Sequence, residues 1–464
     1  MFSGISTKKD ASVHAMRIKD LIAAIRAQHP NKKGLVFLSA NFERDTLPFH
    51  QDSSFFYYTG VKEPGAALCV DSDGKAVLYI PRFAGNRAQW VNNPLNTSAE
   101  SAKTVGVSRI EWLGEELPGY QVGPFFNQEA YSAVIERMKQ VVNAGGSIFT
   151  LNPADSQSNV DQRLVLVRIA QFAPECATAM VDISAQVANQ RRVKDMHELE
   201  QIYRAVSVTE MAHEAAAQVI EKGNAESDVQ ASLEYIMTSA GARCAFPSIV
   251  ATGKNATILH YVDNDGVLND GDLVVVDIGA QYEGYCADIT RTYPVSGAFT
   301  KRQRELYNIV LETQEYIANL AKPGMWLSNK DVPEKSLNHL ARAFLAKKGL
   351  DQYFTHGIGH FLGLDVHDVG DYSRALQEGD VITIEPGLYI PQEGIGIRIE
   401  DNYWIVKDNA VCLSENLPKK AEDIEKFLQE GPDLDEEGDL DDDEEDSYEL
   451  DEIFGEDDED EQKH

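Results

Sequence analysis

The chain has 464 residues, 43% of them hydrophobic, and a formal net charge of −33. This length exceeds what one ordinary hydrophobic core serves, so we expect two domains. Residues 431–464 hold twenty acids and one lysine, a net charge of −19, which leaves −14 for the other 430 residues. Neither part has the basic surface of a nucleic-acid-binding protein, and no apolar run has the roughly eighteen residues of a membrane span. We therefore expect neither nucleic acid nor membrane as a partner.

The cysteines and the amino terminus indicate a cytoplasmic protein. The five cysteines, at positions 69, 176, 244, 286 and 412, lack the paired spacing of a zinc finger, and their odd number argues against a disulfide framework. The first ten residues contain no apolar segment typical of a secretory signal. Cys286 lies two residues before Asp288 and could be a ligand or a nucleophile, but we favour a packed small hydrophobe.

Residues 1–175 are predicted to form a mixed α/β domain. A helix is expected over residues 14–28, where apolar residues recur at helical spacing. Short strands are expected at LVFLS, SFFYYTG, AALCVD and KAVLYI, with Asp73-Gly74 as the turn between the last two. We interpret the aromatic residues of SFFYYTG as mostly core, although some of them could line a binding mouth.

Residues 176–418 are predicted to form a second α/β domain, and residues 419–464 a disordered acidic tail. Thr300 and Gln303 make a capping box at the start of one helix, and another helix is expected over residues 334–348. Each helix pair is followed by strands that carry acids, which suggests two halves related by an internal two-fold. The tail is too charged and too poor in aromatic residues to bury a core.

Two aspartates stand eleven positions apart in DLVVVDIGAQYEGYCADITRTYP. Leu273 to Val276 reads as a buried strand, and it ends in Asp277, an acid that such a strand would not bury without a partner. A turn at Gly279 and Gly284 leads to a second segment, which carries Asp288. This strand–turn–strand pattern can direct two carboxylates at one point.

Three further candidate ligands follow in apolar surroundings. HGIGHFLGLDVHDVG contains His360, VITIEPGLYI contains Glu385, and GIGIRIEDNYWIV contains Glu400. Single acids are usually unrelated surface residues, but five such residues embedded in apolar strands disfavour that interpretation. Four crowded carboxylates repel one another, and an oxygen-rich set with one imidazole suits two divalent ions, Mn²⁺ first, with Co²⁺, Zn²⁺ or Fe²⁺ as alternatives.

Other catalytic motifs are absent from the sequence. His197-Glu198 and His213-Glu214 lack the second histidine of HExxH, and there is no Walker A pattern and no GxSxG elbow. Hydrolysis by metal-activated water is the chemistry that remains.

The four acid-bearing blocks resemble the metal-site blocks of the pita-bread metallopeptidases, above all aminopeptidase P and its relative prolidase. The resemblance runs from about residue 14 to about residue 415. It implies a pita-bread catalytic domain and peptide substrates with proline at the second position. It also implies that Asp288 and Glu400 bridge two metal ions, that Asp277 completes one ion, and that His360 with Glu385 completes the other.

The resemblance further implies a mechanism in which a hydroxide between the two ions attacks the bond before proline, with Glu385 as the proton shuttle. His260 and His367 are expected to contact the substrate carbonyl, and His356 with Tyr389 to surround the proline ring. Arg398 is expected to orient Asp277. The resemblance therefore implies an Xaa-Pro aminopeptidase.

Two alternatives stay open at this point. Arg374, after HDVGDY, could clamp the free carboxylate of an Xaa-Pro dipeptide, as a prolidase requires. A non-catalytic pita-bread binding protein would lose metal ligands, and all five are present here. The segment NFERDTLPFHQDSSFFYYTGVKEPGAALCV resembles the amino-terminal domain of aminopeptidase P, which covers a neighbouring subunit's catalytic mouth in that family, so a homo-oligomer (dimer or tetramer) is expected.

Overall fold

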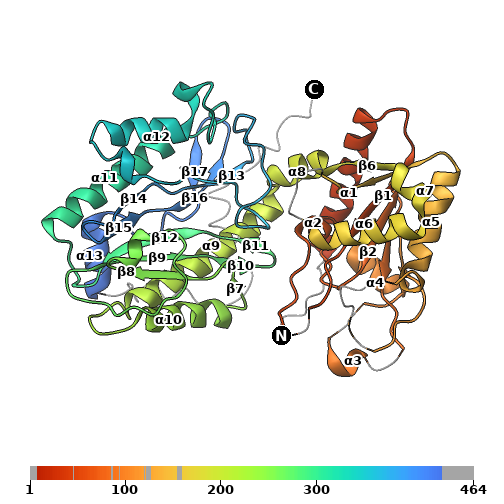
Figure 1. Cartoon of the computed structure of the whole chain (residues 1–464), viewed down its shortest axis with the longest axis horizontal. Helices are drawn as coiled ribbons and strands as arrows, with labels where there is room; N and C mark the ends of the chain where they lie inside the picture. Colours follow the sequence, from red (N-terminus) through yellow and green to blue (C-terminus); the bar gives the residue numbers. More distant parts are fainter. Residues whose placement is uncertain are drawn as a thin grey trace, which may run out of the picture. The chain divides into compact units, whose positions relative to one another are not determined.

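A computed structural model of the protein describes residues 8–44, 46–84, 87–92, 95–119, 121, 127–153 and 159–430. The chain divides into two compact units (Figure 1). The first comprises the described residues up to Val193 together with Asp368–Asp371, and the second comprises the described residues from Lys194 onward apart from that short piece. Within the described ranges, no helix is both long enough and apolar enough to cross a membrane.

The first unit is built on a six-stranded sheet with the strand order β4-β3-β2-β1-β5-β6. The strand β2 runs antiparallel to both β1 and β3, whereas β4 pairs parallel with β3, β5 with β1, and β6 with β5. Their bounds are β1 Gly34–Ser39, β2 Ala67–Asp71, β3 Ala76–Ile80, β4 Arg109–Trp112, β5 Ser147–Thr150 and β6 Met180–Asp182. The predicted turn joins β2 to β3, and Gly74 adopts the positive φ of 87° that favours glycine.

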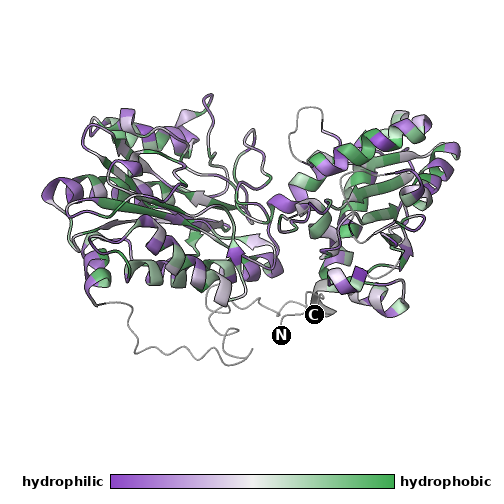
Figure 2. Cartoon of the chain, turned by 60° about the horizontal axis from the view of Figure 1, so that its bottom comes forward, coloured by the Kyte–Doolittle hydropathy of each residue, from purple (hydrophilic) through white to green (hydrophobic). Residues whose placement is uncertain are grey.

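Helices cover this sheet, and Figure 2 shows its strands as largely hydrophobic. Side chains of α5, α6 and α7 pack on the sheet face that carries Leu35, Phe37 and Cys69. The helices of the first unit are α1 Lys8–Gln28, α2 Ser53–Thr59, α3 Arg87–Trp90, α4 Ala99–Val105, α5 Ser132–Asn143, α6 Val160–Phe172, α7 Pro174–Thr178 and α8 Ser184–Arg192.

The segment SFFYYTG, predicted to be a strand, forms the helix α2 instead. The Asp52 side chain accepts a hydrogen bond from the Phe55 amide at 2.8 Å, and Gly60 ends the helix with a φ of 62°. These two caps outweigh the strand preference of consecutive aromatic residues. Phe55, Tyr57 and Tyr58 are buried, in agreement with their interpretation as mostly core.

The second unit places strands between two helix pairs, α9 with α10 and α11 with α12 (Figure 1). The capping box predicted at Thr300 and Gln303 begins α11. The helices are α9 Met196–Ala217, α10 Glu226–Ser239, α11 Lys301–Ala318, α12 Leu337–Ala346 and α13 Ala421–Glu430.

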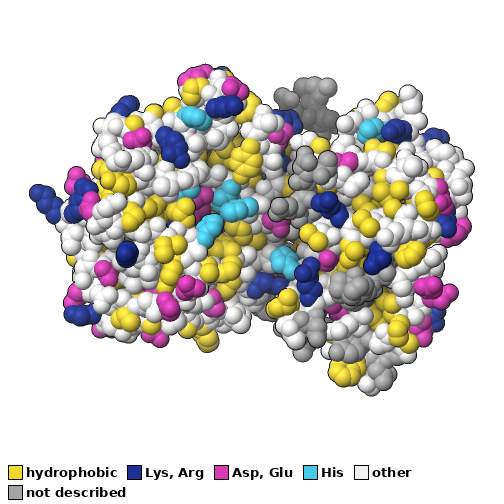
Figure 3. All heavy atoms as spheres, viewed as in Figure 1, with side chains coloured by type: hydrophobic (Ala, Val, Ile, Leu, Met, Phe, Trp, Pro, Cys, Tyr) yellow, Lys and Arg dark blue, Asp and Glu magenta, His cyan; other side chains and the backbone are white. Residues whose placement is uncertain are grey.

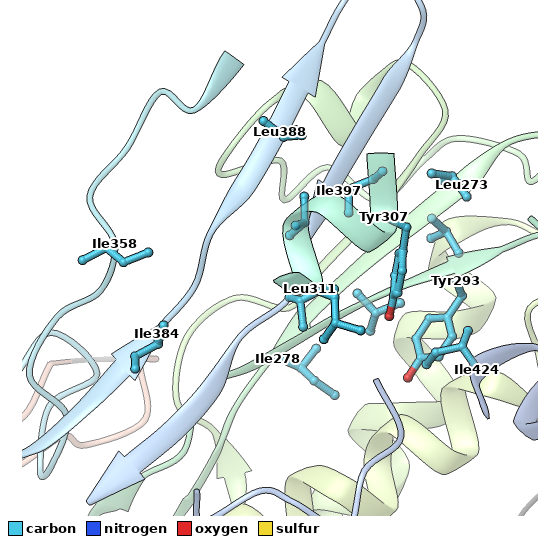
Figure 4. Packing of buried hydrophobic residues seen from close by; sticks show 14 of the residues in the cluster. Leu273, Ile278, Tyr293, Tyr307, Leu311, Ile358, Ile384, Leu388, Ile397 and Ile424 are labelled. Carbon is cyan, nitrogen blue, oxygen red and sulfur yellow. The ribbon is translucent and has the colours of Figure 1, made fainter. Parts of the chain in front are cut away.

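Four small sheets of the second unit hold the strands, in the orders β12-β9-β8, β13-β16-β17, β14-β15 and β11-β10-β7. The bounds are β7 Arg243–Cys244, β8 Ile249–Thr252, β9 Leu273–Ile278, β10 Ala280–Tyr282, β11 Tyr285–Cys286, β12 Ile289–Pro294, β13 Val381–Ile384, β14 Gly387–Ile390, β15 Ile395–Arg398, β16 Asp401–Ile405 and β17 Ala410–Cys412. A continuous apolar core joins these strands to the helices, as the side chains of Leu273, Tyr307 and Ile397 illustrate (Figure 4).

The prediction of a disordered tail over residues 419–464 is wrong for residues 421–430, which form the helix α13. Ala421 and Ile424 are buried in the core of the second unit, and the Phe427 ring stacks on Tyr293 with 6.5 Å between the ring centroids. Apolar residues spaced three apart in an acidic sequence thus create a helix with one core-facing side. Residues 431–464 lie outside the described residues.

Candidate metal centre

Three side chains of the second unit bring donor atoms to one point. One ligand atom each from Asp288, His360 and Glu400 lie within 4.8 Å of one another. The His360 Nε2 atom lies 3.3 Å from Asp288 Oδ2, 3.6 Å from Glu385 Oε1 and 4.0 Å from Glu400 Oε1. Three of the four predicted acidic ligands therefore surround the imidazole nitrogen of the fifth, His360.

Strand pairing brings these residues together from distant parts of the sequence. Asp277 lies on β9, opposite Thr290 of β12, and Asp288 immediately precedes β12. Thr290 also forms an isolated β-bridge with Glu400, which lies between β15 and β16. The amide of Glu400 donates to the Thr290 carbonyl at 3.1 Å. The strand β12 thus brings together Asp277, Asp288 and Glu400, although Asp277 and Glu400 are more than a hundred positions apart in the sequence.

The remaining two predicted ligands are held by β13 and the loop beside it. Glu385 follows β13 directly, and the Thr383 amide donates to the His360 carbonyl at 2.9 Å. The Thr383 hydroxyl in turn accepts from the His360 amide at 3.1 Å. His360 and Glu385 are therefore fixed against the same strand.

The acids leave oxygen atoms that fit a cation. Asp277 Oδ2 accepts from Arg398 at 2.5 Å, and Glu400 Oε2 accepts from the Thr290 hydroxyl at 2.7 Å. The other oxygen of each, Asp277 Oδ1 and Glu400 Oε1, is buried without a hydrogen-bond partner among the described residues. Buried polar atoms are normally paired, so this donor set has the chemistry of a site for divalent cations.

The electrostatics agree with this assignment. Burial raises the pKa of Asp288 to about 6 and that of Glu385 to about 7, and neighbouring acids add to both increases. Burial, followed by the charges of Asp288 and Glu385, raises the pKa of Glu400 well above its usual value. Arg398 offsets only part of this repulsion. Without cations these carboxyl groups resist ionisation, and divalent cations would remove that resistance.

The His360 ring is oriented for ligation. Its Nδ1 atom lies 3.0 Å from the Phe361 carbonyl, to which it can donate, and this leaves Nε2 directed at the acids. Burial by itself would lower the pKa of His360, but the hydrogen bond and the charge of Asp288 raise it to about 9. A bound cation would replace the proton on Nε2.

Arg398 connects the acids to a second pair of residues. Its guanidinium donates to Asp277, to the Thr290 hydroxyl at 3.1 Å and to the Tyr389 hydroxyl at 2.8 Å. The Tyr389 hydroxyl lies 2.9 Å from His356 Nε2. Burial, then the Arg398 charge, lowers the pKa of His356 to about 3, so this imidazole is neutral at physiological pH.

A cavity of about 860 Å³ opens beside the acids, and Figure 3 shows histidine side chains gathered at a hollow in this unit. The described residues that line it include the five predicted ligands together with His260, His356, His367 and Arg398. Apolar residues complete the wall, namely Phe246, Pro247, Ile249, Leu259, Val262 and Val366.

Two predicted residues do not line this cavity. Tyr389 is buried and reaches the site through its hydroxyl contacts with His356 and Arg398. Arg374 is exposed and is not among the lining residues. The sequence reasoning missed Thr290, although its place two residues after Asp288 in a strand puts both on one face, and that spacing could have identified it. It also missed Phe246 and Pro247, which precede a strand and carry no signal of their own.

Comparison with known proteins agrees with this geometry. The profile of metallopeptidase family M24 matches residues 200–407, and that of the aminopeptidase P N-terminal domain matches residues 14–118. The Xaa-Pro aminopeptidase of Escherichia coli is 32% identical over 440 residues, which are 88% of this chain and 96% of that protein. The structure of E. coli aminopeptidase P with the inhibitor Pro-Leu has a TM-score of 0.74 and 30% identity, over 90% of this chain and 98% of that one.

A dipeptidase is also similar, over a shorter stretch. The Xaa-Pro dipeptidase of Pyrococcus horikoshii is 40% identical over 234 residues, which are 49% of this chain and 64% of that protein. The aminopeptidases match both units, whereas this match spans half of the chain. The chain belongs to metallopeptidase family M24, as a metal-dependent Xaa-Pro aminopeptidase with an aminopeptidase P amino-terminal domain and a pita-bread catalytic domain.

Proposed function

We propose that the protein removes the amino-terminal residue from peptides with proline at the second position, with two divalent ions held by Asp277, Asp288, His360, Glu385 and Glu400. In this proposal Asp288 and Glu400 would help to hold both ions, Asp277 would help to hold one of them, and His360 with Glu385 would help to hold the other. The main support is that one buried oxygen each of Asp277 and Glu400 has no hydrogen-bond partner among the residues that the structure describes. Four carboxylates with one imidazole favour Mn²⁺ among the candidate metals.

When bound, the ions supply positive charge that acidifies water and polarises the scissile carbonyl. Glu385 is the proton carrier: it takes a proton from the attacking water and delivers it to the proline nitrogen as the bond breaks. Glu385 lines the cavity beside His360, which places its carboxylate where it can exchange a proton with a substrate bound there.

The histidines at the cavity divide into two proposed roles. His260 and His367 donate hydrogen bonds to the substrate carbonyl oxygen, on which negative charge develops. Burial and the neighbouring His360 lower the pKa of His367, which favours a neutral imidazole that still has an N–H to donate. His356, held by the Tyr389 hydroxyl, contacts the proline ring.

Substrate length separates an aminopeptidase from a dipeptidase. A dipeptidase needs a cation for the carboxylate beside the proline ring. Among the described residues, Arg398 is the only arginine or lysine that lines the cavity, and its guanidinium already contacts Asp277, Thr290 and Tyr389. Arg374 lies outside the lining. This arrangement supports a preference for peptides that extend beyond proline.

The test is kcat/KM on Xaa-Pro-Yaa tripeptides and on Xaa-Pro dipeptides with the same first residue. We expect the tripeptides to react faster, and we expect Arg374→Ala to leave the ratio unchanged. A charge-assisted contact contributes about 1.5–3 kcal/mol, or roughly ten- to a hundredfold. A dipeptide preference of that size, abolished by Arg374→Ala, would identify a dipeptidase instead.

Three expectations accompany this proposal. We keep the domain boundary between residues 175 and 176, a homo-oligomer (dimer or tetramer) and a cytoplasmic location as proposals from the sequence. The size of the particle in solution tests the second of them directly.

A further inference from the structure

We propose that Glu226 is a positioning residue for His260, because its buried carboxylate anchors the whole loop that carries this histidine. The loop follows β8 at Gly253 and returns at Gly266 toward the start of α10. The proposal rests on the proposed contact between His260 and the substrate carbonyl.

Four hydrogen-bond donors, one from the last residue of β8 and three from the loop, converge on Glu226, the first residue of α10. Its Oε1 accepts from the Thr252 amide at 2.7 Å and from Asn255 Nδ2 at 3.1 Å. Its Oε2 accepts from the Gly266 amide at 2.7 Å and lies 2.8 Å from the Tyr261 hydroxyl, which also lies 2.9 Å from Asp265 Oδ1 and can donate to either acid. A carboxylate has about four acceptor positions, so these contacts use its full capacity. They tie down the beginning, the middle and the end of the loop.

Glycine at position 266 leaves room for this carboxylate. A Cβ atom at Gly266 would lie 2.8 Å from Glu226 Oε1, so a side chain at this position would displace the carboxylate. The Glu226 amide returns a hydrogen bond to the Gly266 carbonyl at 2.9 Å. Glu226 is fully buried. Burying an acid is costly unless it is hydrogen-bonded, and many other residues could begin a helix here without that cost. The four donors therefore indicate a specific role for this carboxylate.

Tyr261, which contacts Glu226, is adjacent in the chain to two residues that line the cavity. Tyr261 is buried, whereas its neighbours His260 and Val262 are exposed and line the cavity together with Leu259. A shift of the Tyr261 ring would therefore move residues on both sides of it. A displacement of about 1 Å at a catalytic contact can reduce a rate roughly a hundredfold.

A second anchor restricts the same loop but does not adjoin His260. The Asn264 side chain accepts from the Val250 amide at 2.9 Å and donates to the Ser248 carbonyl at 2.8 Å and to Gln230 at 3.0 Å. This anchor keeps the loop attached to β8 when Glu226 is altered. Replacement of Glu226 should therefore loosen the loop without unfolding the unit.

The experiment compares Glu226→Gln with the exposed control Glu221→Gln in the metal-loaded full chain. The amide keeps the size of the side chain but turns an NH₂ group toward donors, so at least one contact is lost. We expect faster hydrogen exchange in residues 252–266 with unchanged exchange in β9, an unchanged metal content, and kcat/KM lower by roughly ten- to a hundredfold. The control should match the wild type in all three.

A double-mutant cycle with His260→Ala then tests whether Glu226 acts through His260. We expect Glu226→Gln to reduce kcat/KM by less than about twofold when His260 is already absent, because coupled residues are not additive. Tyr261→Phe removes one of the four donors and should show the same pattern with a smaller effect. Fully additive losses, or unchanged exchange in residues 252–266, would overturn the proposal.

The cycle also separates this proposal from the proposed function. If His260→Ala by itself left kcat/KM unchanged, the assignment of His260 would fail and the positioning role would fail with it. If His260→Ala lowered kcat/KM while Glu226→Gln altered neither exchange nor activity, only the role of Glu226 would be wrong.

Discussion

Glu400 and Asp401 are adjacent in the chain and equally buried, but their surroundings are opposite. The Asp401 carboxylate contacts Arg291 at 2.7 Å, Lys419 at 2.9 Å and the Ser414 hydroxyl at 2.8 Å. Burial by itself would raise the pKa of Asp401, but Arg291 and Lys419 hold it well below its usual value. The protein itself supplies the cations that this acid needs.

The Glu400 side chain lies near other acids, including Asp288 and Glu385. Its Oε1 atom is buried without a hydrogen-bond partner among the described residues, and burial with the charges of Asp288 and Glu385 raises its pKa. The two side chains show that burial alone does not distinguish a structural acid from a metal ligand. What distinguishes them is whether the neighbouring cations belong to the chain.

The largest expected effect is on catalysis, from Glu400→Gln or Asp288→Asn. Either change removes a ligand charge, and the loss of metal-derived stabilisation of several kcal/mol should lower kcat/KM by roughly a thousandfold or more. The folded core should remain, because both side chains face the cavity. Steady-state kinetics, elemental analysis of bound metal and circular dichroism together check this. Near-normal turnover by either variant at matched metal concentration would refute the ligand assignment.

The second expected effect is on stability, from Asp401→Asn. Removal of this charge leaves Arg291, which is fully buried, without its carboxylate partner. Breaking a buried ion pair in this way costs about 3–5 kcal/mol of unfolding free energy. Urea denaturation measures the change, and Glu393→Gln in the exposed pair with Arg302 is the control, with a cost of about 1 kcal/mol or less. Equal costs for the two variants would contradict the contrast drawn between Glu400 and Asp401.

The last expected effect is a pH dependence of stability that bound metal should reverse. Folded pKa values of about 6 for Asp288 and about 7 for Glu385 lie above their ordinary values of 3.8 and 4.5. The metal-free folded state then binds more protons than the unfolded state, so its unfolding free energy falls as pH rises from about 4 to about 7. The pKa of about 9 for His360 extends the decline in the same direction.

Thermal unfolding with a chelator and with Mn²⁺, from pH 5 to pH 9, measures this dependence. We expect the gain in Tm from Mn²⁺ to grow with pH, because the ligands must lose their protons to bind. The metal-loaded protein is the control for all other titrating groups, which both samples share. A gain that shrinks as pH rises would show that the acids do not compete with protons for the metal.

The sequence was informative where a local pattern conflicts with its surroundings. Asp277 in one apolar segment and Glu400 in another stood out for this reason, and the structure places both at the cavity. Glu226 did not stand out, because an acid at the start of a helix is an ordinary sequence feature. Its four donors come from residues 26 to 40 positions away, and single-sequence periodicity contains no information on such contacts.

Two element predictions failed for similar reasons. The segment SFFYYTG has strand-forming residues, yet its flanking Asp52 and Gly60 determine a helix. Residues 421–430 were grouped with the acidic tail by composition, and only the packing of Ile424 and Phe427 on the core separates them from it. In both cases a few specific contacts outweighed the average character of the segment.

The position of α13 at the end of the described chain affects how the protein is made. During synthesis the ribosome completes the sheet of the first unit at Asp182, so this unit can begin to fold early. In the second unit, Glu400, Asp401 and Lys419 are synthesised late, and α13 is the last of its described elements to be synthesised. Until then the apolar surface around Tyr293 is uncovered and Arg291 has no carboxylate partner. The nascent catalytic unit therefore depends longest on protection from aggregation, and premature termination before residue 421 leaves it without its final core helix.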